Sequence, residues 1–229
     1  MIRLNLVVEG QTEEGFVRQV LRGHLAQYGV MVAARCVRTS RRRGTVYRGG
    51  VISFQQVRHD LASWMKEDGR QDARFSTLFD LYRLPDDFPE RDARGDPYAR
   101  VKRLEAAFEA AVEDPRFFAH IQLHEFEALL LADPRSLEAE FLEHGNAIRR
   151  LEKMVLKFQS PEEINDGEET APSKRIVREI PEYGPRKAQA GPSVAERIGL
   201  NLLKERCPHF GQWLTRLERL AGHEGASGS

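Results

Sequence analysis

The chain has 229 residues, of which 41% are hydrophobic and 31% are charged. This length and apolar content suffice for one domain with a substantial core. No stretch approaches the roughly 20 consecutive apolar residues that a membrane-spanning helix needs, and the opening MIRLNLVVEG lacks the pattern of a signal peptide. Cys36 and Cys207 lie far apart and form no CxxC motif. We therefore expect reduced thiols in a cytoplasmic protein that does not engage a membrane.

The net charge is zero, with 35 basic and 35 acidic residues, but the charges are distributed unevenly. Residues 30–59 contain no acidic side chain, whereas the arginines in this segment are Arg35, Arg38, Arg41, Arg42, Arg43, Arg48 and Arg58. A basic loop that also contains glycines is typical of a solvated loop and equally of a loop that contacts phosphates. The second interpretation predicts that nucleic acid is bound by Arg41, Arg42, Arg43 and Arg48.

Strands and helices alternate through the first 132 residues. A buried strand is predicted at 2–8, followed by a helix that Thr12 caps and Gly29 ends. The later predicted elements are a strand at 30–37, a helix at 54–66, a strand at 75–81, a helix at 98–112 and a strand at 117–123. This alternation predicts an α/β fold with a mostly parallel sheet and helices on its faces.

The second half of the chain reads differently. Helical periodicity covers 136–158 and 194–220, and the polar segment 159–175 between them contains prolines typical of a loop. The last residues, AGHEGASGS, have the composition of a disordered tail. We therefore predict an α/β core at 1–134, a helical elaboration packed on the core at 135–220, and a disordered tail at 221–229.

Acidic side chains follow three of the predicted strands. Glu9 comes directly after the first strand, Asp80 lies at the end of the third, and His124, Glu125 and Glu127 follow the fourth. The carboxyl ends of parallel strands meet at one edge of a sheet, so these residues are expected to converge. Grouped carboxylates repel one another unless a hard cation lies among them, and Mg²⁺ or Mn²⁺ suits such oxygen ligands.

Each acid also has an ordinary structural interpretation. An acid at a strand end often caps a helix or pairs with an arginine, and Asp80 could cap the turn before Pro85. The acids of HEFE at 124–127, like Glu13 and Glu14, suit the first turn of a helix, where the dipole favours them. The three placements together favour a metal site. The sequence contains no HExxH, P-loop, GxGxxG or GxSxG motif.

The motifs resemble those of a known family. The run VVEGQTEEGF is similar to the first motif of Toprim domains, which occur in topoisomerases, primases and nucleases related to the overcoming-lysogenization-defect proteins. Phrases along nearly the whole chain, including FDLYRLPDDFP, IQLHEFEALLLADP and KERCPHFGQWL, more closely resemble a Toprim-related bacterial domain of unknown function, number four-two-seven-six in its series. The resemblance implies a Toprim-like Rossmannoid core with a C-terminal helical elaboration.

The resemblance also implies a metal-dependent nuclease, or a related phosphodiester-acting protein, of a bacterial anti-phage or mobile-element system. The implied cofactor is Mg²⁺ or Mn²⁺, held by Glu9, Asp80, Glu125 and Glu127. The implied catalytic residues are Glu9, Asp80 and Lys174. Arg175 would join the arginines of segment 41–48 in binding DNA or RNA. An ATPase partner protein is implied as well. Whether the chain forms a homo-oligomer is left open by the sequence.

Two positions depart from the Toprim pattern. Toprim domains carry a DxD motif, whereas this chain has Asp80, Leu81 and Tyr82, so the second metal ligand is the Tyr82 phenol or is absent. Glu125, Glu127 or the nearby Asp86 and Asp87 could supply it instead. The lysine that follows the SKR motif in the family corresponds here to Lys187, displaced by Pro185 and Arg186. These departures favour an alternative function: a non-catalytic nucleic-acid-binding or regulatory subunit of an ATPase complex with a degraded Toprim site.

Overall fold

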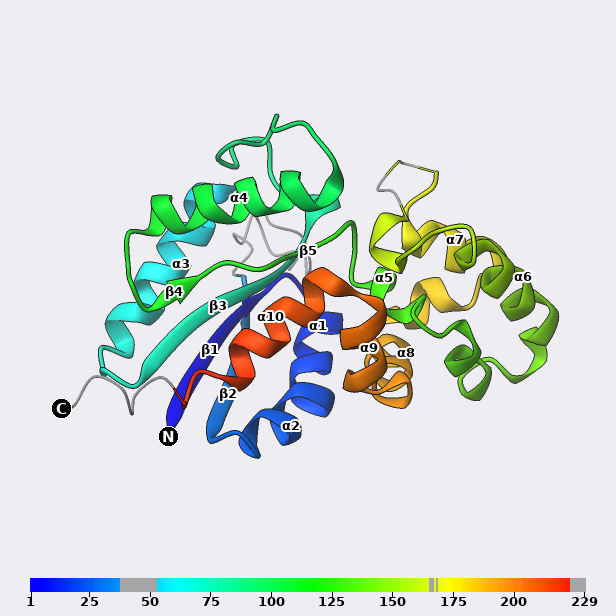
Figure 1. The fold of residues 1–229 in the computed structure, drawn as a ribbon, viewed down its shortest axis with the longest axis horizontal. Helices are drawn as coiled ribbons and strands as arrows, with labels where there is room; N and C mark the ends of the chain where they lie inside the picture. Colours follow the sequence, from blue (N-terminus) through cyan, green and yellow to red (C-terminus); the bar gives the residue numbers. More distant parts are fainter. Residues whose placement is uncertain (38–52, 165–166, 168, 223–229) are drawn as a thin grey trace, which may run out of the picture.

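The computed structural model describes residues 1–37, 53–164, 167 and 169–222. Its centre is a parallel sheet in which the strand order is β2–β1–β3–β4, and β5 extends the β4 edge by also pairing with β3 (Figure 1). The strands are β1 (Ile2–Val8), β2 (Val30–Cys36), β3 (Ala73–Asp80), β4 (Phe117–Phe118) and β5 (Ile121–Gln122). The all-parallel pairing of these strands confirms the predicted α/β fold.

Helices cover both faces of the sheet, as Figure 1 shows. One face is covered by α1 (Gln11–Phe16), a π-helical turn (Val17–Leu21), α2 (Arg22–Ala26) and α10 (Pro208–Glu218). The other face is covered by α3 (Phe54–Glu67) and α4 (Pro97–Val112). Alternation along β1 explains the two cores, because Leu6 and Val8 pack on the first face and Val7 on the second.

The remaining helices gather beyond the carboxyl ends of the strands (Figure 1). They are α5 (Glu127–Leu130), α6 (Gly145–Val155), α7 (Pro172–Glu179), α8 (Tyr183–Ile198) and α9 (Leu200–Arg206), with short 3₁₀ turns between them. Their apolar residues belong to the same core as α1 and α10. Helix α8 lies directly against α1, since a Cβ atom at Gly15 would lie 2.8 Å from Cγ of Pro192. This close approach places α8 beside the carboxyl end of β1.

The structure differs from the sequence-based expectation at several elements. The helix predicted at 136–158 begins only at Gly145, after two 3₁₀ turns, and ends at Val155. The strand predicted at 117–123 is interrupted between β4 and β5, where the Thr77 hydroxyl donates to the His120 carbonyl (2.9 Å) and accepts from its N–H (3.0 Å). The predicted loop 159–175 ends earlier, because Pro172 starts α7. The helix predicted at 194–220 begins already at Tyr183 and is broken at Gly199, whose φ of +79° ends α8, and again at Cys207.

Helices α9 and α10 meet at a glycine that should not tolerate a side chain. A Cβ atom at Gly211 would lie 2.5 Å from the carbonyl oxygen of Lys204, and this backbone atom cannot rotate away. We expect Gly211→Ala to lower the free energy of unfolding by about 2 kcal/mol in urea denaturation. Gly23→Ala is the control, because no atom lies within 4 Å of its added Cβ; this change should stabilise α2 slightly. Equal destabilisation by both substitutions would contradict the proposed clash.

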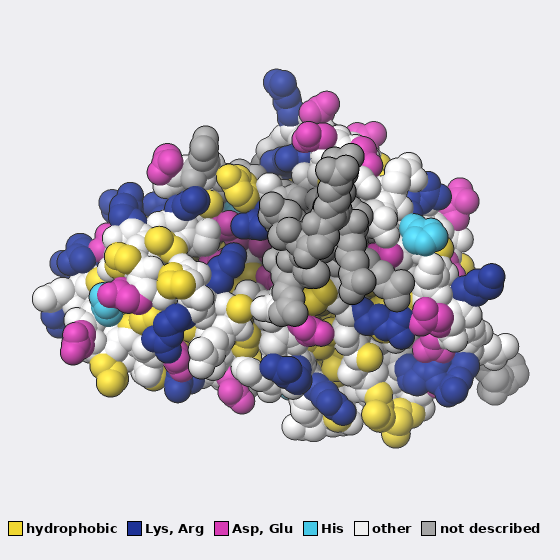
Figure 2. Space-filling model, turned by 180° about the vertical axis from the view of Figure 1, so that it is seen from behind, with side chains coloured by type: hydrophobic (Ala, Val, Ile, Leu, Met, Phe, Trp, Pro, Cys, Tyr) yellow, Lys and Arg dark blue, Asp and Glu magenta, His cyan; other side chains and the backbone are white. Residues whose placement is uncertain are grey.

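None of the helices in the described ranges is both long and apolar enough to cross a membrane. On the face shown in Figure 2, basic and acidic side chains lie interspersed with small apolar groups, in keeping with the net charge of zero. The predicted tail at 221–229 lies outside the described residues from position 223 onward.

Candidate functional site

Glu9 directly follows β1 and lies at the carboxyl edge of the sheet. Its side chain is 7% exposed, and its Oε2 accepts a hydrogen bond from the backbone N–H of Asp80 (3.3 Å). The Nε atom of Arg83 lies 3.8 Å from Oε1. Burial, and next the charge of Glu13, raise the pKa of Glu9 from 4.5 to about 7, against the opposing effects of Arg83 and Lys187. Glu9 is therefore poised to exchange a proton near neutral pH.

Glu13 lies beside Glu9, one helical turn into α1. Its Oε2 accepts a hydrogen bond from the N–H of Gly10 (2.9 Å), so Gly10 is the N-cap and the predicted capping by Thr12 is wrong. The Glu13 side chain is buried, and burial raises its pKa. The interpretation of Glu13 as a simple partner of the helix dipole missed this inward position.

Asp80 is the last residue of β3, and its hydrogen bonds link the end of β1 to the segment that follows β5. Its backbone N–H donates to Glu9, and its Oδ1 accepts from the backbone N–H of Phe126 (2.9 Å), within the HEFE segment. Burial raises the pKa of Asp80 well above its ordinary value, and the charges that add to this rise, largest first, belong to Glu9, Glu13, Glu127 and Glu125. These five acids form one group, which we name the carboxylate cluster: Glu9, Glu13, Asp80, Glu125 and Glu127.

Glu125 and Glu127 are held by the first residues of α7 and α8. The Glu125 carboxylate accepts from the N–H (2.8 Å) and the hydroxyl (3.0 Å) of Ser173. The Tyr183 hydroxyl donates to Oε1 of Glu127 (3.1 Å). Burial raises the pKa of Glu127 to about 7, and burial followed by the charge of Glu127 raises the pKa of Tyr183 well above its ordinary value. Both helices therefore cover the carboxylate cluster.

Lys187 on α8 is a cation that acts on the carboxylate cluster in addition to Arg83. Its charge lowers the pKa values of Glu9, Glu13 and Glu127 against the effect of burial. The sequence left the role of this lysine open, because Pro185 and Arg186 displace it from the family pattern. The VEG-x-x-E spacing at 8–13 and the lysine 14 positions after the SKR motif's first residue would have been the available signals.

The other predicted cations lie elsewhere or cannot be placed. Lys174 is exposed on α7. Arg175 faces the protein itself, because its Nε donates to the carbonyl of Thr170 (2.7 Å) and its guanidinium lies over the ring of Phe158 (5.8 Å). The four arginines predicted to bind nucleic acid, all between positions 38 and 52, lie outside the described residues: Arg41, Arg42, Arg43 and Arg48.

The residues proposed to replace the second Toprim aspartate occupy different positions. Tyr82 lies in the turn after β3, is half-buried, and donates its backbone N–H to the carbonyl of His124 (2.9 Å). Asp87 accepts from the N–H of Phe54 (2.7 Å) at the start of α3, and Asp86 is exposed. The acids that the structure brings next to Asp80 are thus Glu125 and Glu127, together with Glu9 and Glu13.

The donor chemistry of the carboxylate cluster suits a hard divalent cation. In the described part of the chain, one group of three potential metal ligands has donor atoms that all lie within 4.8 Å of one another, and it lies on other residues. The donor atoms of the carboxylate cluster are farther apart than this. Mg²⁺ commonly takes one or two carboxylates and keeps several water ligands. An ion of this kind fits the looser arrangement better than an ion that requires a dry cage of protein ligands.

Comparison with protein families matched residues 8–218 to the model described as Domain of unknown function (DUF4276). Comparison with curated proteins and with solved structures gave no match. The matched range contains the whole carboxylate cluster, Lys187 and all described helices. The chain therefore belongs to the DUF4276 family.

Proposed function

We propose that the protein is a Mg²⁺- or Mn²⁺-dependent Toprim-like nuclease, or a related enzyme that acts on phosphodiesters. One observation carries this proposal: acids from three different strand ends, far apart in the chain, meet in one buried group. Natural proteins seldom bury several carboxylates together without a compensating charge, because each like charge raises the cost of ionising the next. A divalent cation is the simplest compensation for such a group.

The raised pKa values indicate where that compensation is needed. Without a bound cation, Glu9 and Glu127 have pKa values of about 7, and the pKa of Asp80 is raised well above its ordinary value. A bound Mg²⁺ or Mn²⁺ would be held by Glu9 and Asp80, with Glu125 or Glu127, and would supply charge stabilisation at a phosphodiester. The relief of repulsion among these carboxylates would contribute to the affinity for the ion.

The chain's own residues provide the other requirements of phosphodiester cleavage. Glu9, with its pKa of about 7, can accept or donate a proton near neutral pH. Arg83 is 44% exposed at its side chain and lies next to Glu9, and Lys187 is half-buried on α8. These two cations can offset the charge of a phosphate that approaches the cluster. Nucleic acid, DNA or RNA, is therefore the proposed substrate.

A nuclease assay tests this proposal. The purified chain should cleave single-stranded DNA, double-stranded DNA or transfer RNA with Mn²⁺ or Mg²⁺, alone or with the proposed ATPase partner. Glu9→Gln should reduce the cleavage rate by at least about 1,000-fold, since it removes both a metal ligand and a proton carrier. Glu14→Gln on the adjoining helix α1 is the matched control and should retain activity. Wild-type rates in Glu9→Gln would contradict the proposal.

A second candidate function is a non-catalytic nucleic-acid-binding or regulatory subunit of an ATPase complex. The observation that favours it is that side chains of α7 and α8 already donate to two of the carboxylates, Ser173 to Glu125 and Tyr183 to Glu127. In that case the cluster would stay protonated and serve to join α7 and α8 to the sheet. A purified protein whose melting temperature is unchanged by Mg²⁺ and Mn²⁺ would support this function over the nuclease.

A further inference from the structure

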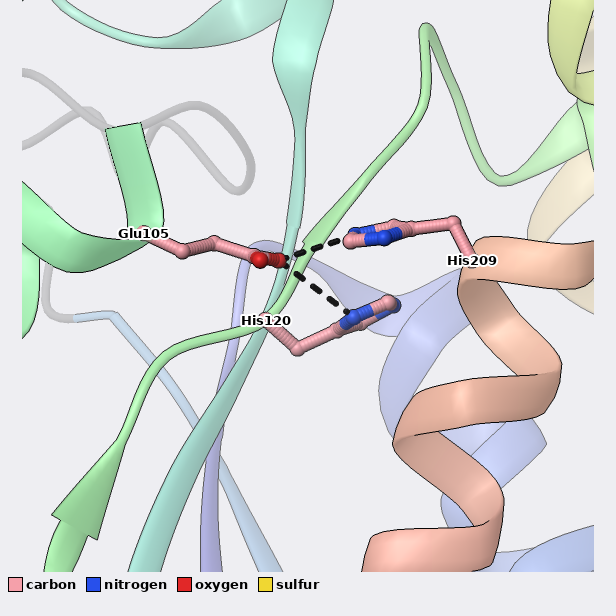
Figure 3. Close-up of side chains that lie close together, drawn as sticks. All are labelled: Glu105, His120 and His209. Carbon is pink, nitrogen blue, oxygen red and sulfur yellow. Dashed lines mark hydrogen bonds and ion pairs between the residues drawn. The ribbon is translucent and has the colours of Figure 1, made fainter. Parts of the chain in front are cut away.

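A second group of metal-ligand side chains lies on different elements. Glu105 projects from α4, His120 lies between β4 and β5, and His209 lies in the first turn of α10 (Figure 3). One ligand atom from each residue lies within 4.8 Å of the other two, and in the described ranges this is the one group of three that meets this distance. We name these three residues the Glu–His–His cluster.

The distances within the cluster approach those of a shared metal ion. Oε1 of Glu105 lies 2.9 Å from Nε2 of His209 and 3.6 Å from Nδ1 of His120. Ligands at about 2.0–2.1 Å from a tetrahedral Zn²⁺ are separated by roughly 3.3 Å, which lies between these two values. In Figure 3 the carboxylate reaches the group from one side and both imidazoles reach it from the other.

The surrounding residues hold these side chains in place. The ring of His120 is stacked between those of His209 (4.9 Å between centroids) and Trp213 (4.4 Å), and Trp213 donates its Nε1–H to the hydroxyl of Ser76 (3.1 Å). Oε1 of Glu105 accepts a hydrogen bond from the backbone N–H of Ile121 (2.9 Å). Outer contacts of this kind orient the ligands of metal sites and limit their movement.

A simple ion pair between Glu105 and His209 would not explain the position of His120. His120 is 1% exposed, and its Nδ1 faces Oε1 of Glu105 at 3.6 Å, beyond hydrogen-bond distance. A buried imidazole that faces a carboxylate without a hydrogen bond is costly as a structural element, and a metal ion bound by both groups would offset this cost.

The cluster is accessible from solvent. It lines a cavity of about 200 Å³ together with Lys102, Gln212, Trp213 and Arg216. This cavity provides an entry path and room for a fourth ligand, which a site with three protein ligands requires. The cations on the cavity wall would favour an anionic or water-derived ligand at that position over a second metal ion.

We propose that Glu105, His120 and His209 bind one Zn²⁺ ion, with the fourth coordination position open to the cavity. Two histidines and a carboxylate with an open position form a ligand set that zinc adopts in proteins. The ion would join α10 to α4 and the β4–β5 segment, and its ligands Glu105 and His209 are 104 positions apart in the sequence. The inference is independent of the proposed nuclease function, because it uses none of the residues of the carboxylate cluster.

Zinc titration of the metal-stripped full-length protein tests this inference. Calorimetry should show one tightly bound Zn²⁺ per chain, and Co²⁺ should give the visible absorption of a four-coordinate site. Glu105→Gln and His209→Gln should each weaken zinc binding by on the order of 100-fold or more, since loss of an outer contact alone costs 10–100-fold. His59→Gln, which changes an exposed histidine, and Asp80→Asn in the carboxylate cluster should bind Zn²⁺ as the wild type does.

The Glu105→Gln and His209→Gln variants are evaluated separately, and circular dichroism confirms that each is folded. Glu105 is partly exposed at its side chain (15%), so Glu105→Gln remains informative if His209→Gln fails to fold. Zinc affinity that is equal in the wild type and in folded Glu105→Gln would overturn the inference. Zinc binding that is lost in Asp80→Asn but kept in Glu105→Gln would also overturn it, because the ion would then occupy the carboxylate cluster.

Discussion

The Asp80→Asn variant is expected to melt at a higher temperature than the wild type when divalent metal is absent at pH 8. Asp80 is buried among four other carboxylates, whose charges oppose its ionisation. Asparagine keeps the oxygen that accepts from the N–H of Phe126 but carries no charge. Removing this repulsion should stabilise the protein by on the order of 2 kcal/mol, or roughly 4–8 °C for a chain of this size.

The same variant should lose the stabilisation that Mn²⁺ gives to the wild type. Binding at 100 times the dissociation constant stabilises a folded protein by about 2.7 kcal/mol, and this gain should vanish without the Asp80 carboxylate. Differential scanning calorimetry with EDTA and with Mn²⁺ measures both effects. Asp86→Asn is the matched control, because it removes the same charge from an exposed position. If Asp80→Asn keeps the full Mn²⁺ shift, the carboxylate cluster is not the metal site.

Much of the fold and part of the site could be predicted from local patterns. Buried strands show continuous apolar runs, and β1 and β3 lie where those runs predicted them, to within two residues. Parallel pairing then placed Glu9, Asp80 and the HEFE segment at one edge, as the topology rule requires. The convergence of these acids needed no knowledge beyond strand order and direction.

The rest depended on packing between distant segments. Glu13 has the sequence position of an ordinary helix-dipole acid, and only the approach of α8 to α1 encloses it. Lys187 joins the site because α8 begins at Tyr183, eleven positions before the helix predicted from periodicity at Val194. Glu105 and His209 are 104 positions apart and belong to no motif, so their contact follows from the docking of α10 beside α4 and β5. Local propensity carries no information about such contacts.

The stability of the metal-free protein is expected to fall as the pH rises from about 5 to 8. Burial raises the folded-state pKa values of Glu9 and Glu127 from 4.5 to about 7. Between these values the folded chain holds protons that the unfolded chain has released, so stability is lost as the pH rises through the folded pKa values. Two such groups give a slope of at most about 2.7 kcal/mol per pH unit, and Asp80 and Glu13 shift in the same direction.

Urea denaturation at several pH values in EDTA measures this slope. The double variant Glu9→Gln, Glu127→Gln separates the effect of the carboxylate cluster from that of other titrating groups. Burial lowers the pKa of His120, so this residue makes stability rise with pH, and it does so equally in the wild type and in the double variant. The double variant should lose most of the fall between pH 5 and 8. Saturating Mg²⁺ should flatten the wild-type curve in the same way, since a bound cation favours the ionised carboxylates. Identical pH profiles for the two proteins in EDTA would contradict the protonated, mutually repelling cluster on which the metal proposal depends.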